Sequence, residues 1–121
     1  MYNILLLDDE IFVQDLFSQF LTHEGYHVEC VSNGREGLEK LREYDADLVI
    51  TDIMMPEMDG LEIVREIRKN RSDLPIIAIS GGMRSAAVNF VSAAKEFGAD
   101  AIFEKPVALA DLLSSVKQLV G

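Results

Sequence analysis

Cysteine is almost absent from this sequence, which excludes two ways of stabilising a small domain. Cys30 is the single cysteine among 121 residues, so the chain forms neither an internal disulfide framework nor a zinc site built from several cysteines. We expect Cys30 to pack as a small hydrophobic side chain. A chain of this length that is 49% hydrophobic can bury one core and not two, so we expect residues 1–121 to form a single domain.

Basic residues are also few. The sequence has 11 Lys and Arg against 21 Asp and Glu, a formal net charge of -10, and its basic residues are scattered along the chain. Contacts with nucleic-acid phosphates require clustered Lys and Arg. We therefore expect no direct nucleic-acid binding.

Long apolar runs are missing too. No run approaches the roughly 20 residues that a membrane span requires. The opening segment, MYNILLLDDE, has neither the basic start nor the cleavage site of a signal peptide. We expect no membrane insertion and a cytoplasmic location.

What the sequence does contain is a set of short apolar runs that each lead into a polar side chain. The pairs are residues 5–7 with Asp8 and Asp9, residues 48–50 with Asp52, residues 76–79 with Ser80, and residues 101–103 with Lys105. If these runs are parallel strands of one sheet, their polar side chains meet at its carboxyl edge, where open α/β sheets place their sites. Carboxylates, a hydroxyl and an ammonium in one crevice suit a divalent cation together with a phosphoryl group.

Strand and helix patterns alternate five times along the chain. Short apolar runs typical of buried parallel strands occur at residues 3–7, 26–31, 47–52, 75–80 and 101–104. Helical spacing of apolar residues follows each run, with Gly25 as a helix stop and Ser32-Asn33-Gly34 as a turn and N-cap. Five βα units with right-handed crossovers allow few topologies. The doubly wound order 2-1-3-4-5 is one of them, and it places strands one and three side by side.

The clustered side chains predict phosphoryl chemistry. Three carboxylates close together raise one another's pKa, and Mg²⁺ relieves this repulsion through oxygen ligands. Asp52 could attack phosphorus and form an aspartyl phosphate, while Lys105 and Mg²⁺ neutralise the oxygens and Ser80 donates a hydrogen bond to one of them. Each residue also has a simpler interpretation. Asp8 and Asp9 could cap a helix, Asp52 could be a bystander, and the other two could be ordinary surface groups. Their coincidence at strand ends favours a site.

Four motifs carry a resemblance to a known family: DDE at 8–10, DIMMPEMDG at 52–60, IS at 79–80 and EKP at 104–106. In this order and at these intervals, the chain closely resembles the receiver domain of two-component response regulators, of the single-domain chemotaxis-regulator type. The resemblance covers the whole chain. It implies a flavodoxin-like, doubly wound (βα)5 sandwich with a five-stranded parallel sheet in the order 2-1-3-4-5.

The resemblance also implies a function in a bacterial phosphorelay. The receiver would take a phosphoryl group from a sensor histidine kinase or a phosphotransfer protein in a Mg²⁺-dependent reaction, and would catalyse only its own phosphorylation and dephosphorylation. Asp52 would be the phosphoacceptor. Asp9, Asp52 and the backbone carbonyl of Met54 would bind Mg²⁺ directly, with Asp8 acting through water, and Lys105 would pair with the phosphoryl group.

Two residues would act as the switch. Ser80 stands where many relatives have threonine and keeps the hydroxyl, whereas Phe103 stands where many have tyrosine and lacks the phenolic OH. Their movement would control a docking face on helix four, strand five and helix five for a downstream protein target. In this family the lysine commonly precedes a cis proline, so the resemblance favours a cis Lys105-Pro106 bond, which the sequence alone would leave trans.

Two other kinds of function remain open at this point. A phosphohydrolase that forms an aspartyl phosphate would want a second acid two residues after the nucleophile, and Met54 occupies that position. A phosphorylation-independent, receiver-like interaction module would keep the acids without using them. Treatment with a small phosphate donor, with and without Mg²⁺, would separate the three possibilities.

Overall fold

The computed structural model describes residues 1–53, 60–81, 95–96 and 98–120. The five strands are β1 (Asn3–Leu7), β2 (His27–Val31), β3 (Leu48–Asp52), β4 (Ile76–Ser80) and β5 (Ala101–Glu104). The helices are α1 (Ile11–His23), α2 (Gly34–Leu41), α3 (Gly60–Asn70) and α5 (Leu109–Val120). The helix expected before Gly98, the loop around Pro56 and the predicted ligand Met54 fall wholly or mainly outside the described residues.

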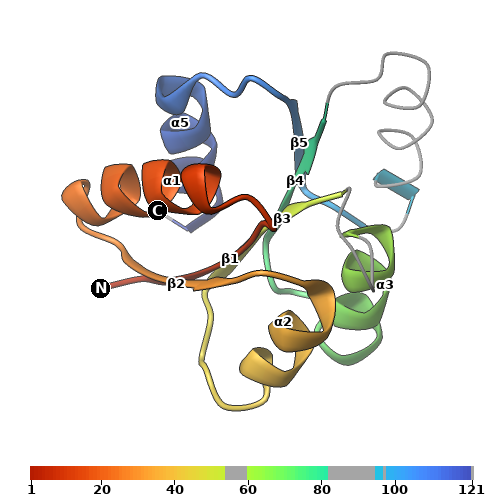
Figure 1. Cartoon of the computed structure of the whole chain (residues 1–121). Helices are drawn as coiled ribbons and strands as arrows, with labels where there is room; N and C mark the ends of the chain where they lie inside the picture. The colour runs from red at the N-terminus through yellow and green to blue at the C-terminus, as the bar shows by residue number, and fades with distance from the viewer. Residues whose placement is uncertain (54–59, 82–94, 97, 121) are drawn as a thin grey trace.

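The strands form one parallel sheet in the order β2-β1-β3-β4-β5, which confirms the predicted doubly wound topology. Helices α1 and α5 cover one face of this sheet, and α2 and α3 cover the other (Figure 1). The inner strands β1, β3 and β4 are mostly apolar and buried because both faces of the sheet are covered.

Successive side chains along each strand point to opposite faces of the sheet, and this divides the core into two layers. On β1, Ile4 and Leu6 join the cluster beneath α1 and α5, whereas Leu5 and Leu7 join the cluster beneath α2 and α3. All four side chains are 0% exposed. Burial of one such side chain stabilises the fold by roughly 1.5–3 kcal/mol. Strand β1 is therefore fixed in register from both sides, and so are the polar residues that follow it.

The ends of the elements are set by local chemistry. Gly25 has a φ of +99°, a left-handed conformation that glycine adopts readily, and it follows the end of α1 as predicted. The side chain of Asn33 accepts a hydrogen bond from the backbone N–H of Glu36, which caps α2. β3 begins at Leu48 rather than Asp47, whose carboxylate instead accepts a hydrogen bond of 2.7 Å from the backbone N–H of Asn3.

Cys30 does not pack as expected. It is exposed on β2, the edge strand of the sheet, where fewer neighbouring side chains cover the surface. The Lys105-Pro106 bond is cis, as the family resemblance favoured. Within the described parts of the chain, no helix combines the length and the apolar character that a membrane crossing requires.

Candidate functional site

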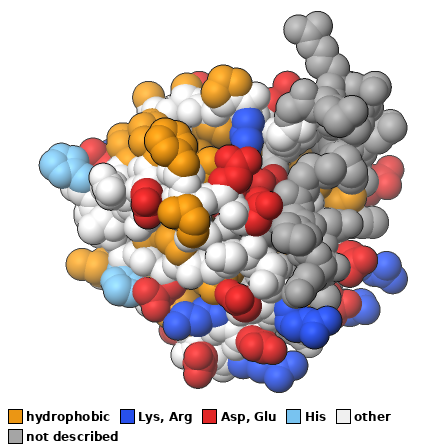
Figure 2. Space-filling view, in the orientation of Figure 1, with side chains coloured by type: hydrophobic (Ala, Val, Ile, Leu, Met, Phe, Trp, Pro, Cys, Tyr) orange, Lys and Arg blue, Asp and Glu red, His pale blue; other side chains and the backbone are white. Residues whose placement is uncertain are grey.

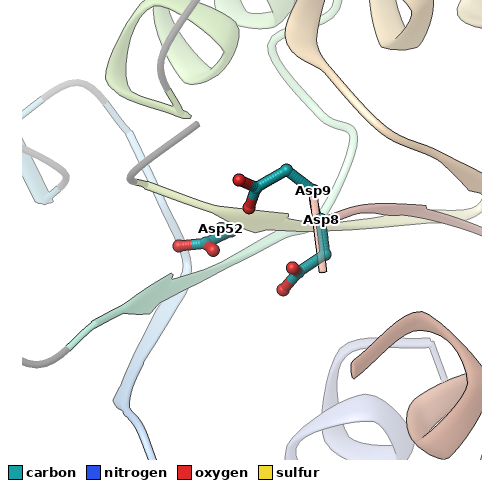
Figure 3. A group of neighbouring side chains, drawn as sticks. All are labelled: Asp8, Asp9 and Asp52. Atoms are coloured by element: carbon teal, nitrogen blue, oxygen red, sulfur yellow. The ribbon is translucent and has the colours of Figure 1, made fainter. Parts of the chain in front are cut away.

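Three carboxylates meet at the carboxyl edge of the two central strands. β1 and β3 are neighbours, and Leu7 pairs with Thr51, so Asp8 and Asp52 both emerge where the strands end. One oxygen from each of Asp8, Asp9 and Asp52 can be chosen so that all three lie within 4.8 Å of one another (Figure 3). Asp8 and Asp52 are 1% and 3% exposed, whereas Asp9 is exposed. The cluster therefore has two buried acids and one that faces solvent.

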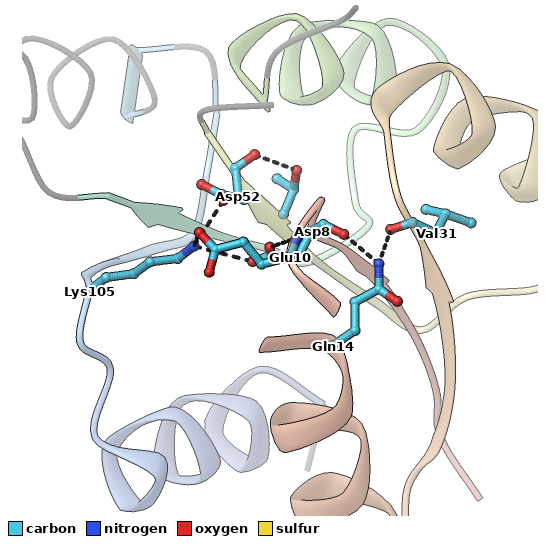
Figure 4. Close-up of polar contacts among 7 residues, drawn as sticks. Asp8, Glu10, Gln14, Val31, Asp52 and Lys105 are labelled. Atoms are coloured by element: carbon cyan, nitrogen blue, oxygen red, sulfur yellow. Dashed lines mark hydrogen bonds and ion pairs between the residues drawn. The ribbon is translucent and has the colours of Figure 1, made fainter. Parts of the chain in front are cut away.

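Lys105 brings the compensating positive charge. Its Nζ lies 3.0 Å from Oδ2 of Asp52, 3.4 Å from Oδ2 of Asp8 and 3.8 Å from Oε1 of Glu10. Figure 4 shows the lysine reaching these acids from the segment that follows β5. The backbone places it there, because the N–H of Lys105 donates a hydrogen bond of 2.8 Å to the carbonyl of Ser80. One ammonium faces several carboxylates, so the site keeps a negative charge.

The charges shift two pKa values in the site. Burial raises the pKa of Asp8, and the carboxylate of Asp52 adds to this, while the N–H of Glu10 and the ammonium of Lys105 act against it. For Lys105, burial acts to lower the pKa, but the carboxylates of Asp52, Asp8 and Glu10 together raise it. Lys105 is thus held as a cation. A further cation beside Asp8 would offset the free-energy cost of burying the charged carboxylate of Asp8.

The switch candidates lie on the adjacent strands. Ser80 ends β4 and is 1% exposed, and its Oγ has no hydrogen-bond partner among the described residues. A buried hydroxyl without a partner costs about 1–3 kcal/mol, so this group gains if an acceptor arrives within reach. Phe103 lies on β5, is partly buried and packs against the apolar cluster beneath α1 and α5.

Gln14 supports the acidic edge, and the sequence analysis missed it. Its Nε2 donates hydrogen bonds to the backbone carbonyl of Asp8 and, at 3.4 Å, to that of Val31 (Figure 4). It also contacts Oγ of Ser32 at 3.3 Å. A signal for this role exists in the sequence, because Gln14 lies on the buried stripe of α1 with Phe17 and Leu21, at spacings of three and seven. A polar residue on such a stripe indicates a buried hydrogen-bonding task.

Gly60 fixes the start of α3 against the end of β3. A Cβ at this position would lie 2.3 Å from the backbone oxygen of Asp52 and 2.6 Å from Cα of Ile53. The N–H of Gly60 donates a hydrogen bond of 2.8 Å to the carbonyl of Ile53. Only glycine permits this approach, which positions the backbone at Asp52.

The donor set fits Mg²⁺. Three carboxylates offer hard oxygen ligands, which Mg²⁺ prefers. Among the described residues, Oδ2 of the buried Asp8 is paired only with the ammonium of Lys105, at 3.4 Å. The structure thus brings together Asp8, Asp9, Asp52 and Lys105, with Ser80 on the next strand. The roles given to these residues, and to Met54 outside the described ranges, stay predictions.

The fold and its acidic edge define a doubly wound α/β protein with its site at the ends of the central strands. A family model described as the response regulator receiver domain matches residues 4–117. The chain belongs to this family.

Relatives and solved structures agree with this assignment. The chain is 36% identical to the response regulator MprA of Mycolicibacterium vanbaalenii over 118 residues. The aligned region covers 98% of this chain and 50% of that relative. It therefore spans about half the length of the curated relatives that it matches. A CheY-like receiver domain protein from Methanospirillum hungatei has a TM-score of 0.90 at 32% identity, covering 99% of this chain and 94% of that one. The response regulator TrrA from Thermotoga maritima, solved in complex with Mg²⁺ and BeF, has a TM-score of 0.87 at 36% identity, covering 98% and 99%.

Proposed function

We propose that this chain is a phosphorelay receiver in which Asp52 accepts a phosphoryl group in a Mg²⁺-dependent reaction. The donor is a sensor histidine kinase or a phosphotransfer protein of a cytoplasmic two-component system. Residues 1–121 act as one receiver domain, which catalyses only its own phosphorylation and dephosphorylation. The phosphorylated form binds a downstream protein target.

The position of Asp52 carries this proposal. It is 3% exposed, it lies 3.0 Å from the ammonium of Lys105, and it shares the acidic cluster with Asp8 and Asp9. A carboxylate held beside a fixed cation and a potential metal site has what phosphoryl transfer requires of a protein, namely positioning and charge neutralisation.

In the proposed step, a carboxylate oxygen of Asp52 attacks the phosphorus of a phosphohistidine. A P–O bond forms on Asp52 while the P–N bond to the donor imidazole breaks, and the imidazole keeps the electron pair and takes up a proton. Lys105 stays beside Asp52 and pairs with an oxygen of the transferred group. The hydroxyl of Ser80 donates a hydrogen bond to a second oxygen of that group.

Mg²⁺ is the cofactor that these acids suit. Asp9 and Asp52 would hold it directly and Asp8 through water, with the backbone carbonyl of Met54 as a further ligand. When bound, it neutralises the negative charge that gathers on the phosphoryl oxygens. The Thermotoga maritima relative in complex with Mg²⁺ and BeF supports this part of the proposal, because beryllofluoride mimics a phosphoryl group.

Acetyl phosphate tests the proposal without a partner protein. With Mg²⁺, we expect the intact mass of the chain to rise by one phosphoryl group, and the addition to be lost in alkali, as for an acyl phosphate. Removal of Mg²⁺ with a chelator and the Asp52→Asn variant should each prevent the mass increase, because one lacks the cation and the other the nucleophile.

The matched control is Asp73→Asn, which removes an exposed acid outside the cluster and should be modified like the parent chain. Modification of Asp52→Asn at the parent rate would contradict the assignment of the phosphoacceptor. A parent chain that binds Mg²⁺ but is never modified would favour a phosphorylation-independent interaction module instead.

A further inference from the structure

A groove between α2 and α3 lies apart from the acidic cluster. Its volume is about 440 Å³. This falls in the range of roughly 300–1,000 Å³ found for ligand sites, so several side chains of a partner could enter it. Its apolar lining is Leu38, Leu41 and Ile67, and its charged lining is Arg42, Arg71 and Glu66.

The uncompensated charge of this groove is positive. The carboxylate of Glu66 is already paired with Lys69, one turn further along α3, at 3.2 Å. By contrast, no ion pair or side-chain hydrogen bond reaches the guanidinium of Arg42 or Arg71 from any residue that the structure describes. Two free guanidiniums beside an apolar floor are suited to carboxylates carried by an apolar ligand.

The two helices that form the groove differ in charge from the rest of the chain. Residues 34–42 and 60–71 contain seven of the 11 Lys and Arg residues and only four acids, so they carry a net charge of +3, whereas the other residues carry -13. Figure 2 shows Lys and Arg side chains gathered over α2 and α3. Two of these basic residues pair with acids outside the two ranges, Lys40 with Glu29 at 3.3 Å and Arg68 with Asp100 at 2.9 Å, which lowers the net charge of this surface to +1. The surface is thus weakly positive on an otherwise acidic chain, a contrast that would favour the approach of acidic partners.

We propose that the groove between α2 and α3 binds an acidic amphipathic helix of a partner protein. The apolar face of that helix would cover Leu38, Leu41 and Ile67, while its Asp or Glu residues pair with Arg42 and Arg71. The groove is lined by residues 38–42 at the end of α2 and 66–71 at the end of α3. At 1.5 Å per residue these segments are about 8 and 9 Å long, which matches one to two turns of a bound helix. The proposal does not depend on phosphorylation of Asp52.

A designed peptide tests this chemistry on the unphosphorylated chain. The probe has about 12 residues, with Leu at i, i+3, i+4 and i+7 and Glu on both flanks. A second peptide carries Lys in place of every Glu. We expect the Glu peptide to shift the amide NMR signals of residues 38–42 and 66–71, and to bind at least about tenfold more tightly than the Lys peptide.

Two charge-reversal variants locate the binding. The double variant Arg42→Glu/Arg71→Glu should weaken the Glu peptide by about tenfold or more and strengthen the Lys peptide. The control Arg35→Glu/Arg65→Glu makes the same change in net charge, at exposed residues of α2 and α3 that do not line the groove, whereas Arg42 and Arg71 directly follow these helices. It should change the affinity by less than about threefold. Thermal unfolding of both variants checks that each remains folded.

Several results would overturn the proposal. One is equal binding of the Glu and Lys peptides, or no binding of the Glu peptide at millimolar concentration. Another is an equal loss of affinity for the Glu peptide in the two double variants. That result would mean that general electrostatic attraction, and not the groove, causes the binding. Concentration-dependent self-association that only Arg42→Glu/Arg71→Glu abolishes would show that a second copy of this acidic chain occupies the groove instead.

Discussion

Asp9 and Glu10 are consecutive exposed acids with different surroundings. Asp9 belongs to the three-carboxylate cluster, whereas Glu10 lies outside it, with its carboxylate 3.8 Å from Lys105. We expect Asp9→Ala to lower the affinity for Mg²⁺ by at least about tenfold, because it removes a direct oxygen ligand. Glu10→Ala should change the affinity by less than about threefold. Calorimetric titration of both variants checks this, and equal losses would contradict the assigned ligands.

Tyr44 predicts a pH dependence away from the site. Burial, with the carboxylates of Glu29 and Asp47, raises its pKa to about 12, against 10.0 for an ordinary tyrosine. Between these values the folded chain keeps a proton that the unfolded chain releases, so the free energy of unfolding falls as pH rises above about 10. Below pH 10 this effect vanishes.

The Tyr44→Phe variant isolates this effect, since it removes the titrating group and keeps the ring. Urea unfolding of both chains between pH 8 and pH 11 should show a steeper loss of stability in the parent chain. Parallel curves over that interval would show that the pKa of Tyr44 does not change on folding.

Residue types at strand ends were enough to predict which side chains lie together at the carboxyl edge, but not which residues support them. Asp8, Asp52, Ser80 and Lys105 follow apolar runs, and parallel topology brings such positions together. The hydrogen bonds of Gln14 could not be derived in the same way, because they depend on how α1 is rotated against the sheet. The exposure of Cys30 depends likewise on which strand lies at the edge.

At the level of secondary-structure elements, the contact between α3 and β3 has a strict steric requirement, because the atoms that approach Gly60 belong to the backbone. A Cβ at Gly60 would lie 2.3 Å from a backbone oxygen, whereas a Cβ at Gly81 would meet nothing closer than Cδ of Lys105 at 3.9 Å. Gly60→Ala should therefore lower the free energy of unfolding by about 2 kcal/mol or more, since the backbone must shift. Gly81→Ala should change it by less than about 1 kcal/mol. Chemical denaturation of the two variants provides the comparison, and equal effects would contradict the close approach.

The boundaries of the elements were predicted to within a residue wherever a local signal exists. β1 and β5 match their expected ranges, and the cap at Asn33 is present. β2 begins one residue later than expected, at His27, because strand ends depend on pairing with neighbours that a sequence window does not contain. The close approach at Gly60 could not be predicted for the same reason, because it depends on how α3 packs against β3.

Over the whole molecule, the charge distribution separates two surfaces. The acidic cluster lies at the carboxyl edge of β1 and β3, and the basic groove lies between α2 and α3. The proposed phosphoryl donor would approach the first, while an acidic helix would bind at the second. The two proposals can therefore be tested separately, because neither set of variants touches the residues of the other.

The switch is also a property of the whole molecule, and the buried hydroxyl of Ser80 makes it testable. This hydroxyl has no hydrogen-bond partner among the described residues, so Ser80→Ala should leave the free energy of unfolding unchanged or raise it by up to about 1 kcal/mol. In the proposed function, a phosphoryl oxygen on Asp52 would accept a hydrogen bond from Ser80. The resulting movement of β4 would displace the paired strand β5 with Phe103 and so favour the proposed active form.

Beryllofluoride with Mg²⁺ stands in for the phosphoryl group in this last prediction. In the parent chain it should shift the amide NMR signals of residues 101–110, and in Ser80→Ala it should bind but shift far fewer of them. The control is Ser72→Ala, which removes an exposed hydroxyl after α3 and should respond like the parent chain. If the mimic binds the parent chain and residues 101–110 do not respond, the signal does not pass through Ser80 and β5, and the output surface lies on another face.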